Sequence, residues 1–312
     1  MKQCDTLLML GTDFPYRQFY PETARILQVD IRPEALGNRA PLTFGAVGTV
    51  NDTLRALVPL IVEQTDTSHL DDCLADYRHA RKALDALAES GPKSTRIHPQ
   101  YLSRVVSELA ADDAVFTADV GTPTAWAARY LTMNGRRRLI GSFNHGSMAN
   151  AIVQAIGAQG AYPDRQVISF SGDGGFAMMM GEFVTLLQTG LPVKIMLLNN
   201  GTLGFVELEM KANAFLDTGC DLTNPNFAAM AEAMGIKSLR VERPQDLRGA
   251  VSEVLAHKGA ALLDVVSARQ ELIMPPKTMP EQAYKFGVFM LKAVMDGRGT
   301  QLIDLARTTL TR

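Results

Sequence analysis

Apolar residues near the start of the chain gather in short runs that are typical of buried strands. Three such runs cover 6–10, 26–29 and 42–47, and a helical pattern follows at about 51–62. Turn-forming residues separate the runs, and Asp30 ends the second one. This order of three strands and one helix predicts part of a Rossmann-like α/β domain.

A different pattern begins where apolar residues recur at helical spacing among many charges, from 69 to 88. The run Ser90-Gly91-Pro92-Lys93-Ser94 interrupts it and predicts a linker with a domain boundary near Gly91. Beyond this point helical and strand patterns alternate, which predicts a parallel sheet with helices on both faces. The predicted strands are 115–118, one near 139, 167–170, 193–198, one near 239 and 261–266, and the predicted helices begin at 99, 124 and 148 or cover 178–188, 227–234 and 247–257.

These patterns divide the chain into four parts and predict an α/β fold class. Residues 1–66 are the partial Rossmann-like domain, and 67–97 are a connecting helix and linker. Residues 98–274 form the second α/β domain, and 275–312 form a tail with helical patterns at 281–295 and 300–309.

Composition places the chain among ordinary folded proteins. Of its 312 residues, 46% are hydrophobic and 21% are charged, which is far from the composition of disordered chains. The net charge of −2 offers no basic field for a phosphate backbone, so we expect no nucleic-acid partner. The three cysteines are scattered without a CxxC pair, which favours a reducing, cytoplasmic location. No apolar stretch reaches the ~18 residues that span a bilayer.

Two polar turns follow two successive apolar strands of the second domain. The first is Gly172-Asp173-Gly174-Gly175, and the second is Asn199-Asn200-Gly201. About one helix and one strand separate them, so Asp173 and Asn200 should emerge at the same edge of neighbouring parallel strands, where ligands bind. A carboxylate, an amide oxygen and a backbone carbonyl at Thr202 suit Mg²⁺ with phosphate oxygens, and the glycines let backbone approach a phosphate closely. The two turns therefore predict a metal–diphosphate clamp.

This pair of motifs resembles the signature of thiamine diphosphate enzymes. Residues 141–149 are similar to the loop that holds the aminopyrimidine in that family, with Met148 wedged between the two rings and the backbone of Gly146 facing the 4′-amino group. Core packing is the alternative for Met148, because it opens a predicted helix. The resemblance implies contacts of thiamine diphosphate and Mg²⁺ with Gly146, Ser147, Met148, Gly172, Asp173, Gly174, Gly175, Asn200, Gly201, Thr202, Leu203 and Gly204, with Asp173, Asn200 and Thr202 as the metal ligands.

Within that family the chain is similar over its whole length to the flavin-dependent bacterial pyruvate oxidases, in particular the quinone-reducing pyruvate dehydrogenase group. Residues 11–17, 119–123 and 297–299 take part in the resemblance. The middle domain of that group binds FAD, which implies flavin contacts at Phe14, Pro15, Tyr16, Arg17, Gln18 and Arg32, although relatives often carry a smaller polar residue in place of Arg32. Without the resemblance, Asp30 is either a ribose-binding acid or a turn residue.

The resemblance also implies a catalytic carboxylate that these residues do not supply. Members of the family carry a glutamate on an N-terminal domain, which binds the pyrimidine and meets the diphosphate domain of another subunit. We therefore expect the chain to be the C-terminal part of a longer, homo-oligomeric enzyme. Two residues are candidate catalytic groups: Phe205 borders the cofactor or packs under its loop, and His145 contacts substrate or makes a turn hydrogen bond.

The activity that the resemblance implies is the oxidative decarboxylation of pyruvate. Pyruvate loses CO₂ on thiamine diphosphate, acetate is released, and electrons pass to FAD and then to ubiquinone. A carboligase such as acetolactate synthase is the alternative among enzymes. A cofactor-binding fragment without turnover is the alternative outside them.

The tail carries one more candidate surface. Leu302, Ile303, Leu305, Ala306 and Leu310 gather mostly on one side of a helical pattern, with Arg307 and Arg312 near them. Such a helix can lie peripherally on the inner face of the cell membrane, where the resemblance places the quinone. A terminal helix packed on its own domain is the alternative, because Asp304 is close to the apolar face.

Overall fold

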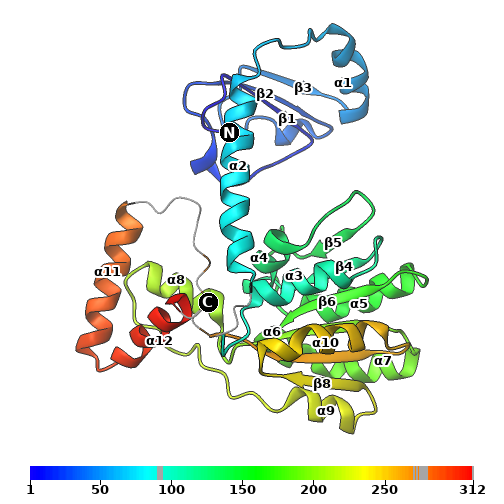
Figure 1. Cartoon of the computed structure of the whole chain (residues 1–312). Coiled ribbons are helices and arrows are strands. Elements are labelled where there is room, and N and C mark those ends of the chain that lie inside the picture. The colour runs from blue at the N-terminus through cyan, green and yellow to red at the C-terminus, as the bar shows by residue number, and fades with distance from the viewer. Residues whose placement is uncertain (90–93, 270, 272, 274–279, 311–312) are drawn as a thin grey trace. The chain divides into compact units, whose positions relative to one another are not determined.

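The computed structural model describes residues 1–89, 94–269, 271, 273 and 280–310 (Figure 1). The chain forms two compact units, Met1–Leu74 and Ala75–Arg312, which we call unit 1 and unit 2. Their division falls inside helix α2 (Ser68–Leu87), the connecting helix that the sequence predicts. The predicted boundary at Gly91 lies outside the described residues.

Unit 1 contains the three strands that the apolar runs predict. They are β1 (Thr6–Leu10), β2 (Arg25–Asp30) and β3 (Phe44–Val47), which pair in parallel in the order β1-β2-β3. Two short 3-10 turns, η1 (Arg17–Phe19) and η2 (Pro33–Ala35), lie in the loops after β1 and β2.

Helix α1 (Val50–Leu57) follows β3 and begins at a local cap. The hydroxyl oxygen of Thr49 accepts a hydrogen bond from the Asp52 N–H at 3.1 Å, which satisfies a donor of the first turn. The sequence predicts a helix to residue 62, and this prediction is wrong. Pro59 lacks an N–H and ends the helix in a 3-10 turn, η3 (Val58–Leu60).

Unit 2 is a six-stranded parallel sheet in the order β5-β4-β6-β7-β9-β8. The chain adds β5 on one side of β4 and then returns to place β6 on the other side, so the direction of winding reverses between β4 and β6. In open parallel sheets, ligands bind outside the carboxyl ends of the strands at such a reversal. The strands are β4 (Val115–Ala118), β5 (Arg138–Gly141), β6 (Val167–Gly172), β7 (Lys194–Asn199), β8 (Lys237–Val241) and β9 (Ala261–Val266).

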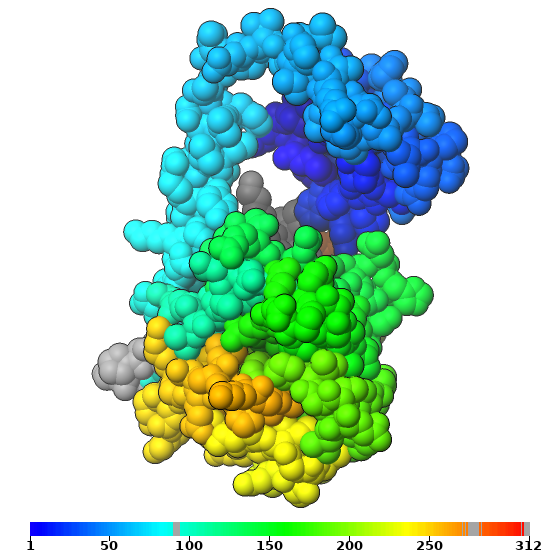
Figure 2. Space-filling model, turned by 90° about the vertical axis from the view of Figure 1, so that its right-hand side faces the viewer, coloured from blue at the N-terminus to red at the C-terminus, as the bar shows by residue number. Residues whose placement is uncertain are grey.

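Helices cover both faces of this sheet, as predicted. Neighbouring residues of a strand point to opposite faces, and both faces are apolar in the central strands: Phe170 packs in one cluster and Val167 in the other. One cluster contains residues of α3 (Pro99–Leu109), α4 (Thr122–Tyr130) and α10 (Pro244–Ala256). The other contains residues of α5 (Asn150–Ala161), α6 (Asp173–Met179), α7 (Phe183–Thr189) and α9 (Phe227–Ala233). In the space-filling view, the yellow and orange segments of α9 and α10 lie beside green segments from the middle of the chain (Figure 2).

Two predicted helices of unit 2 have different bounds in the structure. The single helix expected at 178–188 is two helices, α6 and α7, joined by the 3-10 turn η4 (Met180–Glu182), which contains Gly181. The helix expected from Met148 begins at Asn150, because Ala149 takes a left-handed conformation with φ 63°.

The tail contains α11 (Pro280–Met295) and α12 (Gly299–Leu310), close to the predicted ranges. Arg298 and Lys292 donate to the backbone carbonyls of Asp217 and Ala214 at 2.9 and 2.8 Å, and Asp304 pairs with Arg96 at 3.3 Å. Leu302 and Leu305 are half-buried, whereas Ile303 and Ala306 are exposed. The side chains of Arg307 and Leu310, and residue Arg312, lie outside the described residues.

These contacts tie the tail to unit 2, and membrane docking of its apolar residues stays a prediction. Among the described residues, none of the helices combines the length and the apolar character that crossing a bilayer requires.

Candidate active site

The predicted clamp lies at the carboxyl ends of two directly paired strands. β6 and β7 are parallel neighbours, with Gly172 opposite Leu198 in the register. Asp173 follows β6, and Asn200 follows the last residue of β7, so both emerge at the same edge of the sheet. The prediction that the two turns meet at the same edge of neighbouring parallel strands is confirmed, although two helices rather than one lie between them.

Asp173 is a buried carboxylate, with 3% of its surface exposed. Its Oδ1 accepts the N–H of Gly174 at 2.9 Å, and its Oδ2 accepts the N–H of Gly201 at 2.7 Å and an amide N–H of Asn224 at 2.8 Å. Burial raises the pKa of this carboxyl above its usual value. The donors around it in the described structure are neutral, so its charge lacks a cationic partner there, which is what a metal ion would supply.

Asn200 and Thr202 form the opposite side of the clamp. Asn200 Oδ1 accepts the Thr202 N–H at 3.1 Å, and the Thr202 carbonyl accepts the Gly204 N–H at 2.9 Å. These oxygens, with the Asp173 carboxylate, are the hard donors that suit Mg²⁺. In the described parts of the chain there is no group of three His, Cys, Asp or Glu side chains placed to hold a metal, so phosphate oxygens would have to complete the shell.

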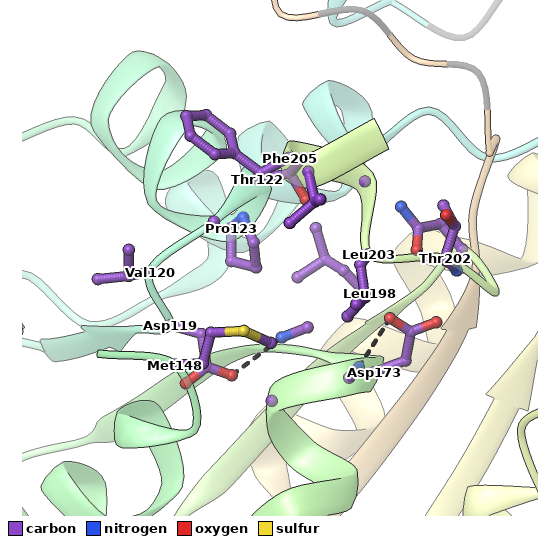
Figure 3. A pocket seen from close by; sticks show the side chains of 17 residues that line it. Asp119, Val120, Thr122, Pro123, Met148, Asp173, Leu198, Thr202, Leu203 and Phe205 are labelled. Atoms are coloured by element: carbon purple, nitrogen blue, oxygen red, sulfur yellow. Dashed lines mark hydrogen bonds between the residues drawn. The ribbon is translucent and has the colours of Figure 1, made fainter. Parts of the chain in front are cut away.

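The glycines of the first turn keep the backbone free of side chains where space is short. A Cβ on Gly175 would lie 2.6 Å from Asp119 Oδ2, and one on Gly174 would lie 2.8 Å from Leu203 Cδ2. A cleft opens beside them, and Figure 3 shows the side chains that line it. Of the predicted cofactor contacts, the lining residues are Met148, Gly172, Asp173, Gly174, Gly175, Asn200, Thr202, Leu203 and Gly204.

The predicted pyrimidine loop reaches this cleft through Met148. Met148 is 39% exposed and lines the cleft, so it is not the fully buried core residue of the alternative interpretation. Gly146 has φ 76°, and its N–H donates to the Ser142 carbonyl at 2.7 Å in a tight turn. Ser147 and Gly201 are adjacent in sequence to lining residues, and Gly146 is two residues before Met148, but these three do not line the cleft. Their contacts with a cofactor stay predictions.

The two predicted catalytic residues differ in position. Phe205, in the first turn of α8 (Gly204–Ala212), lines the cleft and is 41% exposed (Figure 3). His145 is exposed and does not line the cleft. Their catalytic roles stay predictions, and the geometry favours Phe205.

Asp119 was not predicted as an organiser of the site, although it directly follows β4. Its Oδ1 accepts the N–H of Ala151 at 2.8 Å, and its Oδ2 accepts the N–H of Gly172 at 3.1 Å. Burial raises its pKa to about 6, and the hydrogen bonds from backbone N–H groups oppose that shift. The carboxylate thereby joins the ends of β4 and β6 to the start of α5. Its sequence signals are an acidic residue after an apolar strand and its place in the resembling run 119–123, and neither indicates these hydrogen bonds.

A buried ion pair lies behind the Thr202 side of the clamp. The Glu207 carboxylate accepts the Thr202 hydroxyl at 2.6 Å and pairs with Lys211 at 2.5 Å, and both charged residues are at most 3% exposed. Burial by itself raises the pKa of Glu207, but the hydrogen bonds from Lys211 and Thr202 hold it below its usual value. From sequence, Glu207 and Lys211 resemble any exposed helical i,i+4 pair, so their burial could not be predicted.

The predicted flavin contacts lie in unit 1 after the carboxyl ends of β1 and β2. Phe14 is half-buried, whereas Pro15, Tyr16, Arg17 and Gln18 are exposed. Arg32 is exposed and pairs with Asp30 at 3.5 Å. Asp30 Oδ1 accepts the Arg32 N–H at 2.9 Å, which is the contact expected of a turn residue. The positions suit a ligand at the sheet edge, and FAD itself stays a proposal.

Comparison with known families matches both units. Residues 119–265 match the thiamine pyrophosphate enzyme C-terminal TPP binding domain, and residues 1–57 match the thiamine pyrophosphate enzyme central domain. Thiamine pyrophosphate is another name for thiamine diphosphate. The chain therefore carries the central and C-terminal domains of the thiamine pyrophosphate enzyme family.

Individual relatives support this assignment without fixing the reaction. The chain is 33% identical over 99% of its length to YdaP of Bacillus subtilis (strain 168), which is provisionally named as a thiamine pyrophosphate-containing protein, and covers 53% of it. It is 31% identical over 88% of its length to the acetolactate synthase large subunit of Porphyra purpurea and covers 48% of that protein. An uncharacterized 42.6 kDa protein of Pseudomonas amyloderamosa is 62% identical over 33% of the chain, which covers 27% of it. The chain thus spans about half the length of the first two relatives.

Proposed function

We propose that this chain supplies the Mg²⁺- and diphosphate-binding part of a thiamine diphosphate-dependent enzyme that decarboxylates pyruvate. The observation that carries the proposal is the buried Asp173 carboxylate, which faces Asn200 and Thr202 across two paired strand ends without a cationic partner in the described structure. The matched TPP binding domain spans these same residues.

The residues of the clamp have separate tasks in this proposal. Asp173, the Asn200 amide oxygen and the Thr202 carbonyl would hold Mg²⁺, and Gly174 and Gly175 leave room for the phosphates. Thiamine diphosphate, when bound, supplies the carbon that adds to the 2-oxo acid and stabilises the charge left by departing CO₂. Met148 and Phe205, which line the cleft, would exclude water around it.

The names of the relatives favour a carboligase as the reaction that follows decarboxylation. Acetolactate synthases of several organisms are about a third identical to most of this chain. We therefore place acetolactate synthesis from pyruvate first.

Oxidation to acetate, with FAD and ubiquinone as electron acceptors, is the second candidate. The match to YdaP leaves this candidate open, because it takes in 99% of the chain and the name of that relative assigns no reaction. Homo-oligomers, and peripheral binding of the tail at a membrane that holds the quinone, belong to this second candidate.

Binding of thiamine diphosphate tests the cofactor part of the proposal. We expect titration calorimetry to detect binding in the presence of Mg²⁺ and not in the presence of excess chelator. Equal affinity for thiamine diphosphate with and without Mg²⁺ would contradict the assignment of the metal site.

The products separate the two reactions. The protein, isolated from its own cells under native conditions, would be given pyruvate, thiamine diphosphate, Mg²⁺ and FAD. Acetolactate with no lasting bleaching of flavin supports the carboligase. Acetate with bleached flavin supports the oxidase, and absence of CO₂ release would contradict both.

A further inference from the structure

A continuous line of hydrogen bonds runs from Asp173 to the edge of the sheet in unit 2. The amide nitrogen of Asn224 donates to Asp173 Oδ2 at 2.8 Å and to Asn199 Oδ1 at 2.9 Å. The amide nitrogen of Asn199 donates to Asp264 Oδ1 at 2.9 Å, and Arg240 donates to Asp264 Oδ2 at 2.7 Å. These five residues come from the start of α6, from β7, β8 and β9, and from the loop before α9.

The charged end of this line determines how each amide is oriented. Asp264 is fully buried and paired with the Arg240 guanidinium, so its carboxylate can only accept hydrogen bonds. Asn199 must therefore turn its NH₂ group towards Asp264 and its oxygen towards Asn224. Asn224 must in turn present its NH₂ group to that oxygen, and its second N–H is left for Asp173.

The arrangement leaves the two oxygens of Asp173 unequal. Oδ2 receives the Gly201 N–H and the Asn224 amide, whereas Oδ1 receives the N–H of the neighbouring Gly174. A carboxylate held in this way cannot rotate about its χ2 bond without breaking two hydrogen bonds at once. Mg²⁺ demands near-ideal octahedral geometry, so a fixed ligand direction matters more to it than to Ca²⁺, which accepts irregular shells.

We propose that Asn224 is a positioning residue, which fixes the Asp173 carboxylate in the direction that Mg²⁺ requires. The inference rests on the proposed function, because it assumes that Asp173 is a metal ligand. Residues that orient a metal ligand in this way commonly change metal affinity 10–100-fold when they are mutated.

The loop that carries Asn224 has other anchors, so the variant should fold. Leu222 donates to the Gly201 carbonyl at 3.0 Å, and Leu203 donates to the Cys220 carbonyl at 2.9 Å. The same loop offers a matched control in Asn226, whose side chain accepts the Ala229 N–H at 3.0 Å and caps α9. Asn226→Ala removes a hydrogen bond of the loop that does not involve Asp173.

The experiment compares Asn224→Ala and Asn226→Ala with the unaltered chain. Calorimetry measures the affinity for thiamine diphosphate with Mg²⁺ and, separately, with Ca²⁺, and circular dichroism checks the fold. We expect Asn224→Ala to weaken binding about tenfold or more with Mg²⁺ and far less with Ca²⁺. Asn226→Ala should lower the melting temperature and leave the ratio of the two affinities unchanged.

The possible results separate the role of Asn224 from the proposed function. Equal weakening with both cations would mean that Asn224 only stabilises the loop, and unchanged binding would mean that it has no role; either overturns the inference while the cofactor proposal stands. Failure of the unaltered chain to bind thiamine diphosphate with either cation would overturn the proposed function, and this inference with it.

Discussion

Each of the two parallel sheets ends in a buried aspartate, and the two carboxylates are satisfied in different ways. Asp30 in unit 1 bonds to Arg32, two residues along the chain, through both backbone and side chain. Asp173 in unit 2 accepts the N–H of the adjacent Gly174 and also bonds to Gly201 and Asn224, which are 28 and 51 residues away. None of these donors carries a charge. A carboxylate with a local cation stabilises its own turn, whereas one held by remote neutral donors keeps its charge available for a ligand.

The largest effect that tests this comparison is the loss of cofactor binding in Asp173→Ala. Removal of the carboxylate should abolish Mg²⁺-dependent binding of thiamine diphosphate, measured by calorimetry, because the cation loses its charged ligand. Asp30→Ala removes a carboxylate that is equally buried and should leave that binding unchanged. Equal losses in the two variants would remove the distinction between them.

The second prediction compares how much one ion pair of each unit contributes to the free energy of unfolding. Glu207→Gln removes the carboxylate charge that pairs with the buried Lys211, and we expect a loss of roughly 3–5 kcal/mol in the free energy of unfolding. The pair of Asp13 and Arg39 in unit 1 lies at the surface, where water screens the charges, so Arg39→Gln should lower the stability far less. Urea denaturation measures both, and similar values would show that burial does not set the contribution of these pairs.

Glycine substitutions should give a smaller difference in stability between the two units. In Gly175→Ala the new methyl group would meet the Asp119 carboxylate and the Ala149 backbone nitrogen at 2.6 and 3.1 Å, and overpacking of this kind costs about 1–3 kcal/mol. In Gly45→Ala of unit 1, the nearest atom is a terminal methyl of Leu42 at 3.3 Å, which can move aside. Thermal unfolding should therefore show a clear loss for Gly175→Ala and a slight change for Gly45→Ala.

The smallest effect concerns the pH dependence that Asp119 gives to unit 2. Burial raises its pKa to about 6 in the folded chain, compared with roughly 3.9 in an unfolded one. Folding therefore takes up a proton between these values, and the free energy of unfolding should fall as the pH rises from about 4 to about 6. Asp119→Asn cannot titrate, so denaturation at several pH values should show a flatter dependence, and an identical slope would contradict the assignment.

Much of the site could be predicted because its signals are local. Apolar runs mark β6 and β7, and the polar turns after them contain Asp173 and Asn200. Strand direction then brings the turns to one edge without further information. The glycines could also be predicted from the sequence, because positions where other atoms approach the backbone closely require a residue without a side chain.

Other parts of the site could not be predicted because their partners are distant in sequence. Asn224 lies in an Asn-Pro-Asn run that reads as an ordinary turn, and Asp264 reads as a polar residue in an otherwise apolar strand. Their bonds to Asp173 and Asn199 span 51 and 65 residues. The predicted bounds of helices were also wrong where a single residue determines them, as Pro59 does at the end of α1.

The sequence by itself determined the α/β class, the parallel direction of the strands in the second domain and the edge at which a diphosphate would bind. Hydrophobic periodicity and turn chemistry are properties of neighbouring residues, so they can be recognised without knowledge of the fold. The tertiary structure alone decided which carboxylates are buried, which are paired and which are held by neutral donors. These properties depend on the packing of segments that the chain brings together from far apart, and they distinguish Asp173 from Asp30.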